Sequence, residues 1–200
     1  MERKFQTEPV VHSSLGLQAL CQKLQSVASC DILELGPVRG GNIEFWSRFR
    51  PSIYVADLRS SLPLPVLSSE ASEFIEPEWD RLLGLPENHS YDVILAWDLL
   101  NYLDLPAVAS LITYLRRFCR PGTVLFSLIF DQKEMPEKIT VYRIADESHL
   151  QYEYAGSEMR ICPRHQPHTL FGVMNRFHTS ESFRLRNGVL EYLFVYEGAM

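Results

Sequence analysis

The sequence predicts one α/β domain, residues 1–200, with a doubly wound, mostly parallel sheet and a C-terminal antiparallel hairpin. Three observations carry this prediction. Short apolar runs alternate with stretches of helical periodicity, which is typical of a parallel sheet covered by helices. Glycine or acidic residues follow several of these runs, and an Asn-Gly pair lies between two β-rich runs near the end. The length of 200 residues suits a single domain with a substantial core.

The N-terminal segment, residues 1–30, is expected to be helical. Either Ser13 or Ser14 can cap a helix, because its hydroxyl oxygen can accept a bond from a free backbone N–H of the first turn. The apolar positions that follow are Leu17, Leu20, Leu24 and Val27. Their 3-4-3 spacing directs one face of the helix toward a core.

A strand, a glycine-rich turn and a second helix are expected next. Residues 31–35 are a short apolar run, typical of a buried strand. Residues 42–49 predict a helix with Asn42 as its N-cap. Residues 52–57 predict another buried strand, which again ends in an acid. From there to residue 90 the chain is broken by prolines and gives only weak helical signals.

The middle of the chain predicts a strand, an amphipathic helix and a strand. Residues 91–97 form a clear buried run, and Pro106 suits the first turn of the helix that follows. The apolar face of that helix consists of Val108, Leu111, Ile112, Leu115 and Phe118. We expect the Pro-Gly turn at residues 120–122 to end the helix and residues 123–130 to form the next buried strand.

The pattern changes over residues 131–168, which we expect to form an insertion or a lid. Weak alternation at 139–144 and 150–154 predicts paired strands on either side of a polar turn. A short helix is expected within residues 170–177. The chain then closes with a hairpin, whose Asn187-Gly188 pair predicts a two-residue type I′ turn.

Composition and charge narrow the function classes. The chain is 46% hydrophobic and 22% charged, as ordinary globular proteins are, and its net charge of −6 disfavours nucleic acid and anionic membranes as partners. No apolar run reaches about 18 residues, and residues 1–14 lack the apolar segment of a secretory signal. The 4 cysteines are scattered, so we expect a reducing, cytoplasmic environment. The sequence sets no oligomeric state.

Polar and glycine residues gather at one edge of the predicted sheet. Glu34 and the turn up to Gly41 follow the first strand, Asp57 ends the second, and residues 96–101 end the strand in mid-chain. In a doubly wound sheet the ligand binds beyond the carboxyl ends of the strands. The sequence therefore predicts a small-molecule site at this edge.

The turn disfavours a dinucleotide and favours S-adenosylmethionine. Val38 stands where a dinucleotide-binding turn needs a glycine for close approach to the pyrophosphate, and Pro37 lacks a backbone N–H. A nicotinamide dehydrogenase is thus disfavoured. S-adenosylmethionine has no phosphate and carries positive charge, so Glu34 beside the turn is favourable. Asp57 is placed to accept both ribose hydroxyls.

The order of these motifs resembles the class I S-adenosylmethionine-dependent methyltransferases. Residues 34–40, ELGPVRG, are similar to the family's first motif, an acid followed by glycines at alternate positions, with Val38 in place of the middle glycine. Asp57 matches the acid that ends the family's second strand. Residues 91–103 resemble the motif around its fourth strand.

The resemblance extends from Asp31 to Tyr196. Residues 115–129 are similar to the helix, Pro-Gly turn and fifth strand of the family, and residues 182–194 to its closing hairpin. The resemblance implies a class I methyltransferase-like fold with S-adenosylmethionine as cofactor. The residues it implies for cofactor binding are Glu34, Gly36, Pro37, Gly40, Asp57, Leu58, Trp97 and Asp98.

The methyl acceptor stays open, and no catalytic residue is identified. Methyl transfer from a sulfonium mainly requires that donor and acceptor be aligned in a dry site. Residues 131–168 follow a strand that ends at the same edge, so we expect them to cover the acceptor side. The candidate substrate residues are Asn101, Tyr102, Tyr142, Arg143 and Arg160, and Tyr152 and Tyr154 of the same segment supply further aromatic faces.

Methyl transfer to an unidentified small molecule is the preferred function, and the sequence does not settle whether the chain is an enzyme. Val38 and the lack of a clear third strand leave open a methyltransferase-like protein that binds S-adenosylmethionine for regulation without catalysis. The spacing of Cys162, His165 and His168 could suit zinc, but two prolines and no fourth ligand nearby favour a solvated loop. No metal is expected.

Overall fold

A six-stranded sheet forms the centre of the computed structural model, which describes residues 10–37, 39–58, 76–154 and 156–198. The strand order is β10-β11-β5-β4-β2-β3. The strands are β2 (Cys30–Glu34), β3 (Pro51–Val55), β4 (Tyr91–Trp97), β5 (Cys119–Phe130), β10 (Phe177–Arg184) and β11 (Val189–Tyr196). Strands β2 to β5 are parallel, and β10 and β11 are antiparallel to their neighbours. The predicted fold class is confirmed.

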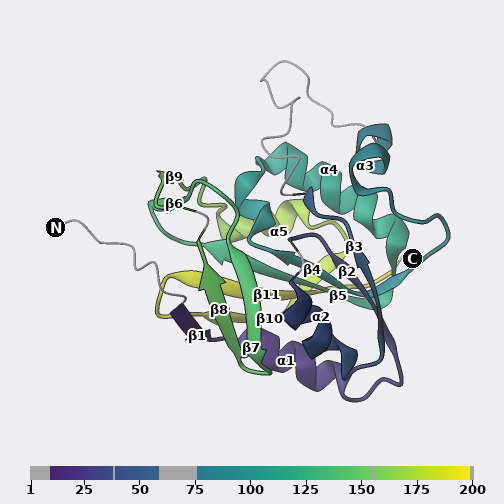
Figure 1. Cartoon of the computed structure of the whole chain (residues 1–200). Coiled ribbons are helices and arrows are strands. Elements are labelled where there is room, and N and C mark those ends of the chain that lie inside the picture. Colours follow the sequence, from purple (N-terminus) through teal and green to yellow (C-terminus); the bar gives the residue numbers. More distant parts are fainter. Residues whose placement is uncertain (1–9, 38, 59–75, 155, 199–200) are drawn as a thin grey trace.

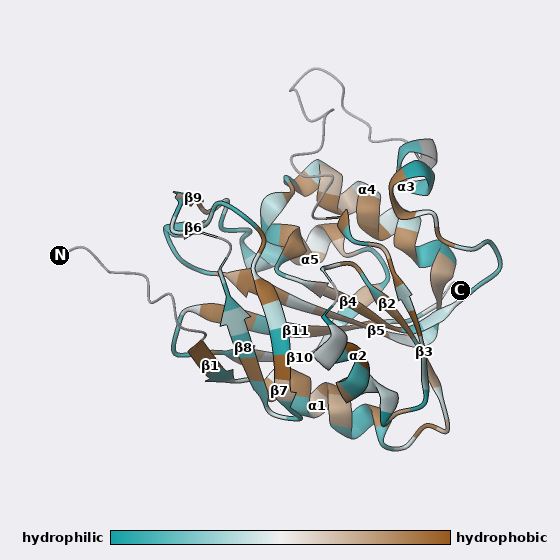
Figure 2. Ribbon diagram, viewed as in Figure 1, coloured by the Kyte–Doolittle hydropathy of each residue, from teal (hydrophilic) through white to brown (hydrophobic). Residues whose placement is uncertain are grey.

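Helices cover both faces of this sheet, as Figure 1 shows. The helices are α1 (Leu15–Leu24), α2 (Gly40–Ser47), α3 (Glu76–Leu83), α4 (Leu105–Leu115) and α5 (Pro167–Val173), with the short 3-10 helices η2 (Leu99–Tyr102) and η3 (Arg116–Phe118). Helices α3, α4 and α5 share one apolar cluster, and α1 and α2 share another on the opposite face. Figure 2 shows the hydrophobic strands between these two layers. None of the helices in the described ranges has the length and apolarity to span a bilayer.

The predicted serine cap is confirmed, Asp104 is a cap that was not predicted, and the cap predicted at Asn42 is wrong. The Ser14 hydroxyl accepts a bond from the N–H of Leu17 at 3.1 Å, and Asp104 accepts one from Ala107 at 2.9 Å. Asn42, however, lies inside α2, where Arg39 is the N-cap. Its side chain contacts β7 instead, so a tertiary contact outweighed the local cap signal.

The C-terminal hairpin is confirmed, but its turn is not type I′. The N–H of Gly188 donates to the carbonyl of Leu185 at 3.1 Å, so Arg186 and Asn187 are the central residues. Gly188 has φ +82°, whereas Asn187 is not among the described residues of positive φ. A type I′ turn needs positive φ at both central positions. Gly188 therefore occupies the left-handed position after the turn, as a glycine in a bulge does.

The Pro-Gly pair at residues 121–122 also does not end helix α4, although this was predicted. Helix α4 ends at Leu115, and residues 120–122 lie inside β5. Gly122 has φ +94°, and the register between β4 and β5 shifts between Tyr91 and Val93. Pro121 and Gly122 thus produce an irregular start of the strand instead of ending the helix.

Residues 131–168 form two small antiparallel sheets beside the main one. Strands β7 (Val141–Asp146) and β8 (His149–Glu153) pair as predicted, and β1 (Val10–Ser13) adds to β8. Strands β6 (Glu134–Pro136) and β9 (Met159–Ile161) form the second sheet. Tyr142, Leu150 and Tyr152 are buried in the same apolar cluster as α1 and α2. The β7-β8 hairpin is therefore packed into the core.

The edge of the main sheet beyond β2 is β3. No clear third strand of the methyltransferase pattern was predicted from the sequence, and residues 59–75, between β3 and α3, lie outside the described part of the chain. Val38 lies outside it as well.

Candidate functional site

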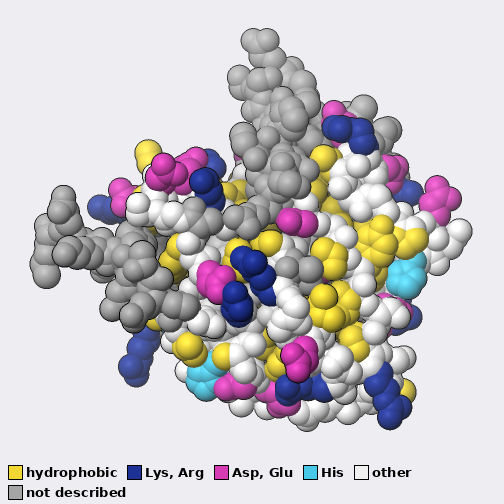
Figure 3. Space-filling model, viewed as in Figure 1, with side chains coloured by type: hydrophobic (Ala, Val, Ile, Leu, Met, Phe, Trp, Pro, Cys, Tyr) yellow, Lys and Arg dark blue, Asp and Glu magenta, His cyan; other side chains and the backbone are white. Residues whose placement is uncertain are grey.

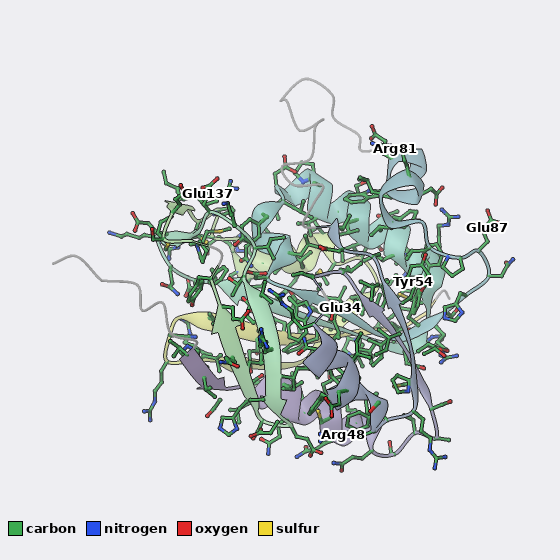
Figure 4. All side chains as sticks on the ribbon, in the orientation of Figure 1. Glu34, Arg48, Tyr54, Arg81, Glu87 and Glu137 are labelled. Carbon is green, nitrogen blue, oxygen red and sulfur yellow. The ribbon has the colours of Figure 1, made fainter. Side chains whose placement is uncertain are left out.

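The carboxyl ends of β2, β3 and β4 meet at one edge of the sheet. The N–H of Leu35 donates to the carbonyl of Leu95 at 3.1 Å. The N–H of Ala56 donates to the carbonyl of Glu34 at 2.8 Å. A further bond at 3.2 Å runs from Leu58 to Leu35. These bonds hold the loops after β2 and β3 side by side, so the predicted convergence of strand ends is present. Figure 4 shows Glu34 near the centre of the molecule, with Glu87 and Glu137 at its periphery.

Glu34 is a buried acid without a cationic partner. Its residue is 2% exposed, and its Oε1 accepts bonds from the N–H of Gly36 at 3.0 Å and the indole N–H of Trp97 at 2.5 Å. Burial raises the pKa of the carboxyl to about 8, the two hydrogen bonds oppose this, and the charge of nearby Asp57 adds to it. Within the described chain, no lysine, arginine or histidine contributes. Glu34 therefore holds its proton at neutral pH.

Trp97 lies directly on the glycine turn. A Cβ atom at Gly36 would come within 2.8 Å of Trp97 Cδ1 and 3.2 Å of Glu34 Oε1, so only glycine fits there. Trp97 has φ +46°, an unfavourable backbone conformation for an aromatic residue. Its indole stacks on Tyr142, with centroids 5.3 Å apart and planes at 9°. The surrounding packing thus holds Trp97 over the turn.

The other residues implied for the cofactor differ in exposure. Leu58 is buried, Pro37 is half-buried, and Asp57 and Gly40 are exposed. Gly40 begins α2 and has open space around its Cβ position. The structure thus brings Asp57 and Leu58 beside the Glu34 turn, with Asp57 facing solvent.

Asp98 lies at the end of β4 and faces the segment that carries β7. It is fully buried, and its Oδ2 accepts a bond from the N–H of Thr140 at 3.1 Å. Burial raises the pKa of Asp98 to about 7, although the nearby hydroxyls of Thr140 and Tyr142 lower it. These hydroxyls are close to the carboxyl, yet Oδ1, Thr140 Oγ1 and Tyr142 Oη have no hydrogen bond of good geometry.

Two of the predicted substrate residues connect structural elements. The amide nitrogen of Asn101 donates to the carbonyls of Asp98 and Leu128, both at 2.8 Å, and its oxygen accepts from Phe130 at 2.8 Å. The hydroxyl of Tyr102 lies 3.1 Å from the carbonyl of Pro136 and 2.8 Å from that of Lys138. Both amide hydrogens of Asn101 are therefore engaged within the protein.

The two predicted arginines lie at the surface. Arg143 forms an ion pair with Glu153, which also lies 3.7 Å from Arg39. Arg160 is exposed on β9. In Figure 3, basic and acidic side chains adjoin on the face in view. Tyr142 alone among the predicted substrate residues of residues 131–168 is brought into contact with Trp97.

Tyr152, one of the aromatic residues expected on the acceptor side, belongs to the same buried group, and so does Thr140, which was not predicted. Tyr152 pairs with Tyr142 across β7 and β8, and their rings meet edge-on at 4.9 Å. Cross-strand partners share one face of a sheet. The predicted pairing of these two runs agrees with this contact, whereas no sequence pattern pointed to Thr140.

The three residues with zinc-like spacing differ in their surroundings: Cys162 is buried, His165 is half-buried and His168 is exposed. The thiol of Cys162 lies 3.6 Å from the carbonyl of Phe130, and His165 Nε2 lies 2.9 Å from that of Leu100 and 3.0 Å from that of Leu103. Across the described ranges, no group of three or more histidine, cysteine or acidic residues is arranged to hold a metal ion.

Comparison with known proteins identifies the fold. No protein-family model and no curated protein sequence matches the chain. An S-adenosylmethionine-dependent methyltransferase from Clostridium acetobutylicum matches with a TM-score of 0.55 and 13% identity, over 92% of this chain and 90% of that one. A Pyrococcus horikoshii protein matches with a TM-score of 0.55 and 10% identity, over 91% and 89%.

A third solved structure includes bound ligands. It is the 1,6-didemethyltoxoflavin-N1-methyltransferase of Burkholderia thailandensis, with 1,6-didemethyltoxoflavin and S-adenosylhomocysteine bound. The TM-score is 0.51 and the identity 13%, over 92% of this chain and 78% of that one. At such identities, the likeness establishes a shared fold.

Proposed function

Because this chain has the class I methyltransferase fold, we propose that it binds S-adenosylmethionine at the carboxyl ends of β2, β3 and β4 and transfers its methyl group to a small molecule. The observation that carries the proposal is Glu34. A fully buried acid that lacks a cationic partner in the described chain suits a ligand that brings its own positive charge. The Burkholderia structure supports the proposal, since that protein binds S-adenosylhomocysteine in the same fold.

The residues at this edge fit such a cofactor. When bound, S-adenosylmethionine supplies a methyl group made electrophilic by the sulfonium. Glu34 offers negative charge to the cationic end, and a cation beside it lowers the pKa of its carboxyl, so binding releases a proton. Asp57, exposed beside the same turn, accepts bonds from the ribose hydroxyls. The remaining cofactor residues of this proposal are Gly36, Pro37, Gly40, Leu58 and Trp97.

The acceptor is placed on the side of residues 131–168. Tyr142 lies on this side and reaches Trp97, so it lies closest to the turn among the candidates from this segment. Arg143 and Arg160 line the outer surface of the same segment. A dry, aromatic surface next to the turn favours alignment of donor and acceptor by exclusion of water.

One observation favours the alternative of binding without catalysis. The indole of Trp97 already donates to Glu34 and covers Gly36. A cofactor must displace or share this contact, which weakens binding by the cost of moving a buried, stacked ring. A regulatory protein of methyltransferase fold would tolerate that cost better than an enzyme with rapid turnover.

Calorimetric titration with S-adenosylmethionine and S-adenosylhomocysteine tests the proposal. We expect both to bind, and Glu34→Gln to weaken binding of each about tenfold or more, because a charge-assisted bond is lost. Glu44→Gln, the same change on α2 outside the strand-end edge, is the matched control and should leave affinity unchanged. If neither compound binds, the proposal is wrong. Formation of S-adenosylhomocysteine with small-molecule extracts then separates the enzyme from the regulatory protein.

A further inference from the structure

Asp98 lies among four tyrosines from separate elements. Tyr102 comes from η2, Tyr142 from β7, Tyr152 from β8, and Tyr154 from the chain after β8. Burial is the main cause of the raised pKa of each of them, and the charge of Asp98 adds to it in all four. These phenols therefore stay neutral at physiological pH, and Asp98 is the acid that they surround.

Several buried polar atoms in this group lack a hydrogen bond of good geometry, although the hydroxyls of Thr140 and Tyr142 lie close enough to Asp98 to lower its pKa. These atoms are Asp98 Oδ1, Thr140 Oγ1, Tyr142 Oη and Tyr152 Oη. Their residues are at most 3% exposed. Buried polar atoms are nearly always hydrogen-bonded, because leaving one unpaired costs free energy. The poor hydrogen-bond geometry of Asp98 Oδ1 and of the Thr140 and Tyr142 hydroxyls beside it indicates that this carboxyl can accept a further donor.

That donor is not a cation of the described chain. The pKa of Asp98 responds to burial first and then to hydrogen bonds from Thr140, Tyr142 and its own backbone, with no lysine, arginine or histidine among the causes. Arg160 lies exposed on β9, and its charge lowers the pKa of Tyr102. Aromatic rings and a carboxylate without a positive partner together favour an organic cation.

We propose that Asp98, with the rings of Tyr142 and Tyr152, binds an ammonium group of the methyl acceptor, so that the substrate is an amine. This inference rests on the proposed methyltransferase function and assigns the acceptor side of the same site. The two buried acids then have separate roles: Glu34 binds the cofactor, and Asp98, which the sequence resemblance implied for the cofactor, binds the acceptor instead.

An ammonium group supplies the hydrogen-bond donors and the positive charge that the residues around Asp98 lack. Its N–H bonds satisfy Asp98 Oδ1 and the hydroxyl oxygens of Tyr142 and Thr140, and its charge meets the carboxylate and the aromatic faces. An amine must lose a proton before its nitrogen lone pair can attack a methyl group. Asp98 takes that proton from the ammonium, which leaves a neutral amine and a carboxylic acid. Because Asp98 is fully buried, the stack of Trp97 on Tyr142 must part to admit the amine.

Binding of small probes to the full chain tests this assignment. The probes are methylammonium and phenethylammonium, with methanol and 2-phenylethanol as uncharged counterparts. The readout is the indole N–H signal of Trp97 in a nitrogen–proton NMR spectrum, identified among 3 tryptophans with Trp97→Phe. We expect the ammonium probes to shift this signal and the alcohols not to. The affinity should rise about fivefold between pH 6 and pH 7 and about tenfold by pH 8, and level off above, as Asp98 ionises near its pKa of about 7.

Asp98→Asn and Asp104→Asn form a matched pair. Asparagine keeps the shape of Asp98 but not its charge, so we expect at least a tenfold loss of ammonium binding. At Asp104 asparagine caps α4 as well as aspartate does, so binding should be unchanged. Equal binding of ammonium and alcohol, binding of neither, or unchanged ammonium binding in Asp98→Asn would overturn the proposal. S-adenosylhomocysteine titrated into the same samples reports separately on the proposed function, since that binding depends on Glu34.

Discussion

The acidic residues at the two ends of the parallel sheet differ in their burial and in their charged partners. At the amino ends, Asp92 accepts a bond from the N–H of Asp31 at 2.9 Å and from Arg120 Nε at 2.8 Å, and its side chain is partly exposed. At the carboxyl ends, Glu34 and Asp98 are fully buried and have no cationic partner in the described chain. An acidic side chain thus has a positively charged partner at the amino ends of the strands, whereas the two acids at the carboxyl ends have none in the described chain.

This difference separates stability from function within one sheet. Asp92 and Arg120 join the starts of β4 and β5, and nothing further is needed for that contact. Burial instead raises the pKa of Glu34 to about 8 and that of Asp98 to about 7, because it disfavours the charged form. Strained or unsatisfied groups that cluster at strand ends are a mark of a binding site. The carboxyl end is therefore where a ligand adds most to the stability of this fold.

The largest effect is expected from Glu34→Gln on the pH dependence of stability. The carboxyl of unfolded chains ionises near pH 4.5, whereas in the fold its pKa is about 8. Between these values the folded state binds the extra proton, so stability falls as pH rises and levels off above about pH 8. The difference corresponds to at most about 5 kcal/mol. Glutamine can still accept the bonds from Gly36 and Trp97, so the variant should lose this slope.

Urea denaturation from pH 5 to pH 9 measures the slope. We expect the free energy of unfolding of Glu34→Gln to exceed that of the wild type increasingly toward pH 8. Asp98 contributes a second slope of the same sign, from its ordinary value of 3.8 to about 7, which Asp98→Asn removes. Parallel curves for the wild type and Glu34→Gln would show that Glu34 is ionised in the fold.

Gly36→Ala should destabilise the carboxyl end of the sheet. The added methyl would meet Trp97 Cδ1 at 2.8 Å and Glu34 Oε1 at 3.2 Å, and Trp97 is confined by its stack on Tyr142. We expect a loss of about 1–3 kcal/mol, typical of overpacking. Gly40→Ala is the control, since its Cβ has open space and alanine suits the start of α2. Equal thermal midpoints for the two variants would contradict the tight contact at Gly36.

Asp57→Ala should weaken the cofactor without affecting the fold. Two ribose hydroxyls would lose their acceptor, which corresponds to about 1–3 kcal/mol, or about ten- to a hundredfold in affinity for S-adenosylhomocysteine. Asp57 is exposed, so stability should change little. Calorimetric titration beside Glu87→Ala, an exposed acid on the loop before β4, measures the difference. Unchanged affinity in folded Asp57→Ala protein would remove Asp57 from the site.

The smallest effect is expected at the amino ends. Asp92→Asn removes a partly exposed ion pair with Arg120, although asparagine can still accept the bond from Asp31. Such pairs contribute about 0–1 kcal/mol and are screened by salt. The free energy of unfolding should fall by less than about 1 kcal/mol, and the difference should shrink in about 1 M salt. A larger loss would mean that both ends of the sheet depend equally on their acids.

The sequence by itself determined the fold class and the residues at the strand ends. The alternation of buried runs and amphipathic helices depends on spacing along the chain, and so does the position of Glu34, Asp57 and Asp98 just at or beyond their strands. Patterns of this kind are local, so they can be read without the structure. The same local reasoning misplaced the N-cap of α2 and the type of the final turn.

Only the tertiary structure decided which side chains share a contact. Trp97 donates to Glu34 from 63 positions away, and Asp98 accepts from Thr140 across 42 positions. Asn42 became a partner of β7 instead of a helix cap because its amide lies between the carbonyl of Tyr142 and the N–H of Ile144, at 2.8 and 2.9 Å. Bonds between distant residues depend on how the layers pack, and burial then sets the pKa values on which the function of this edge depends.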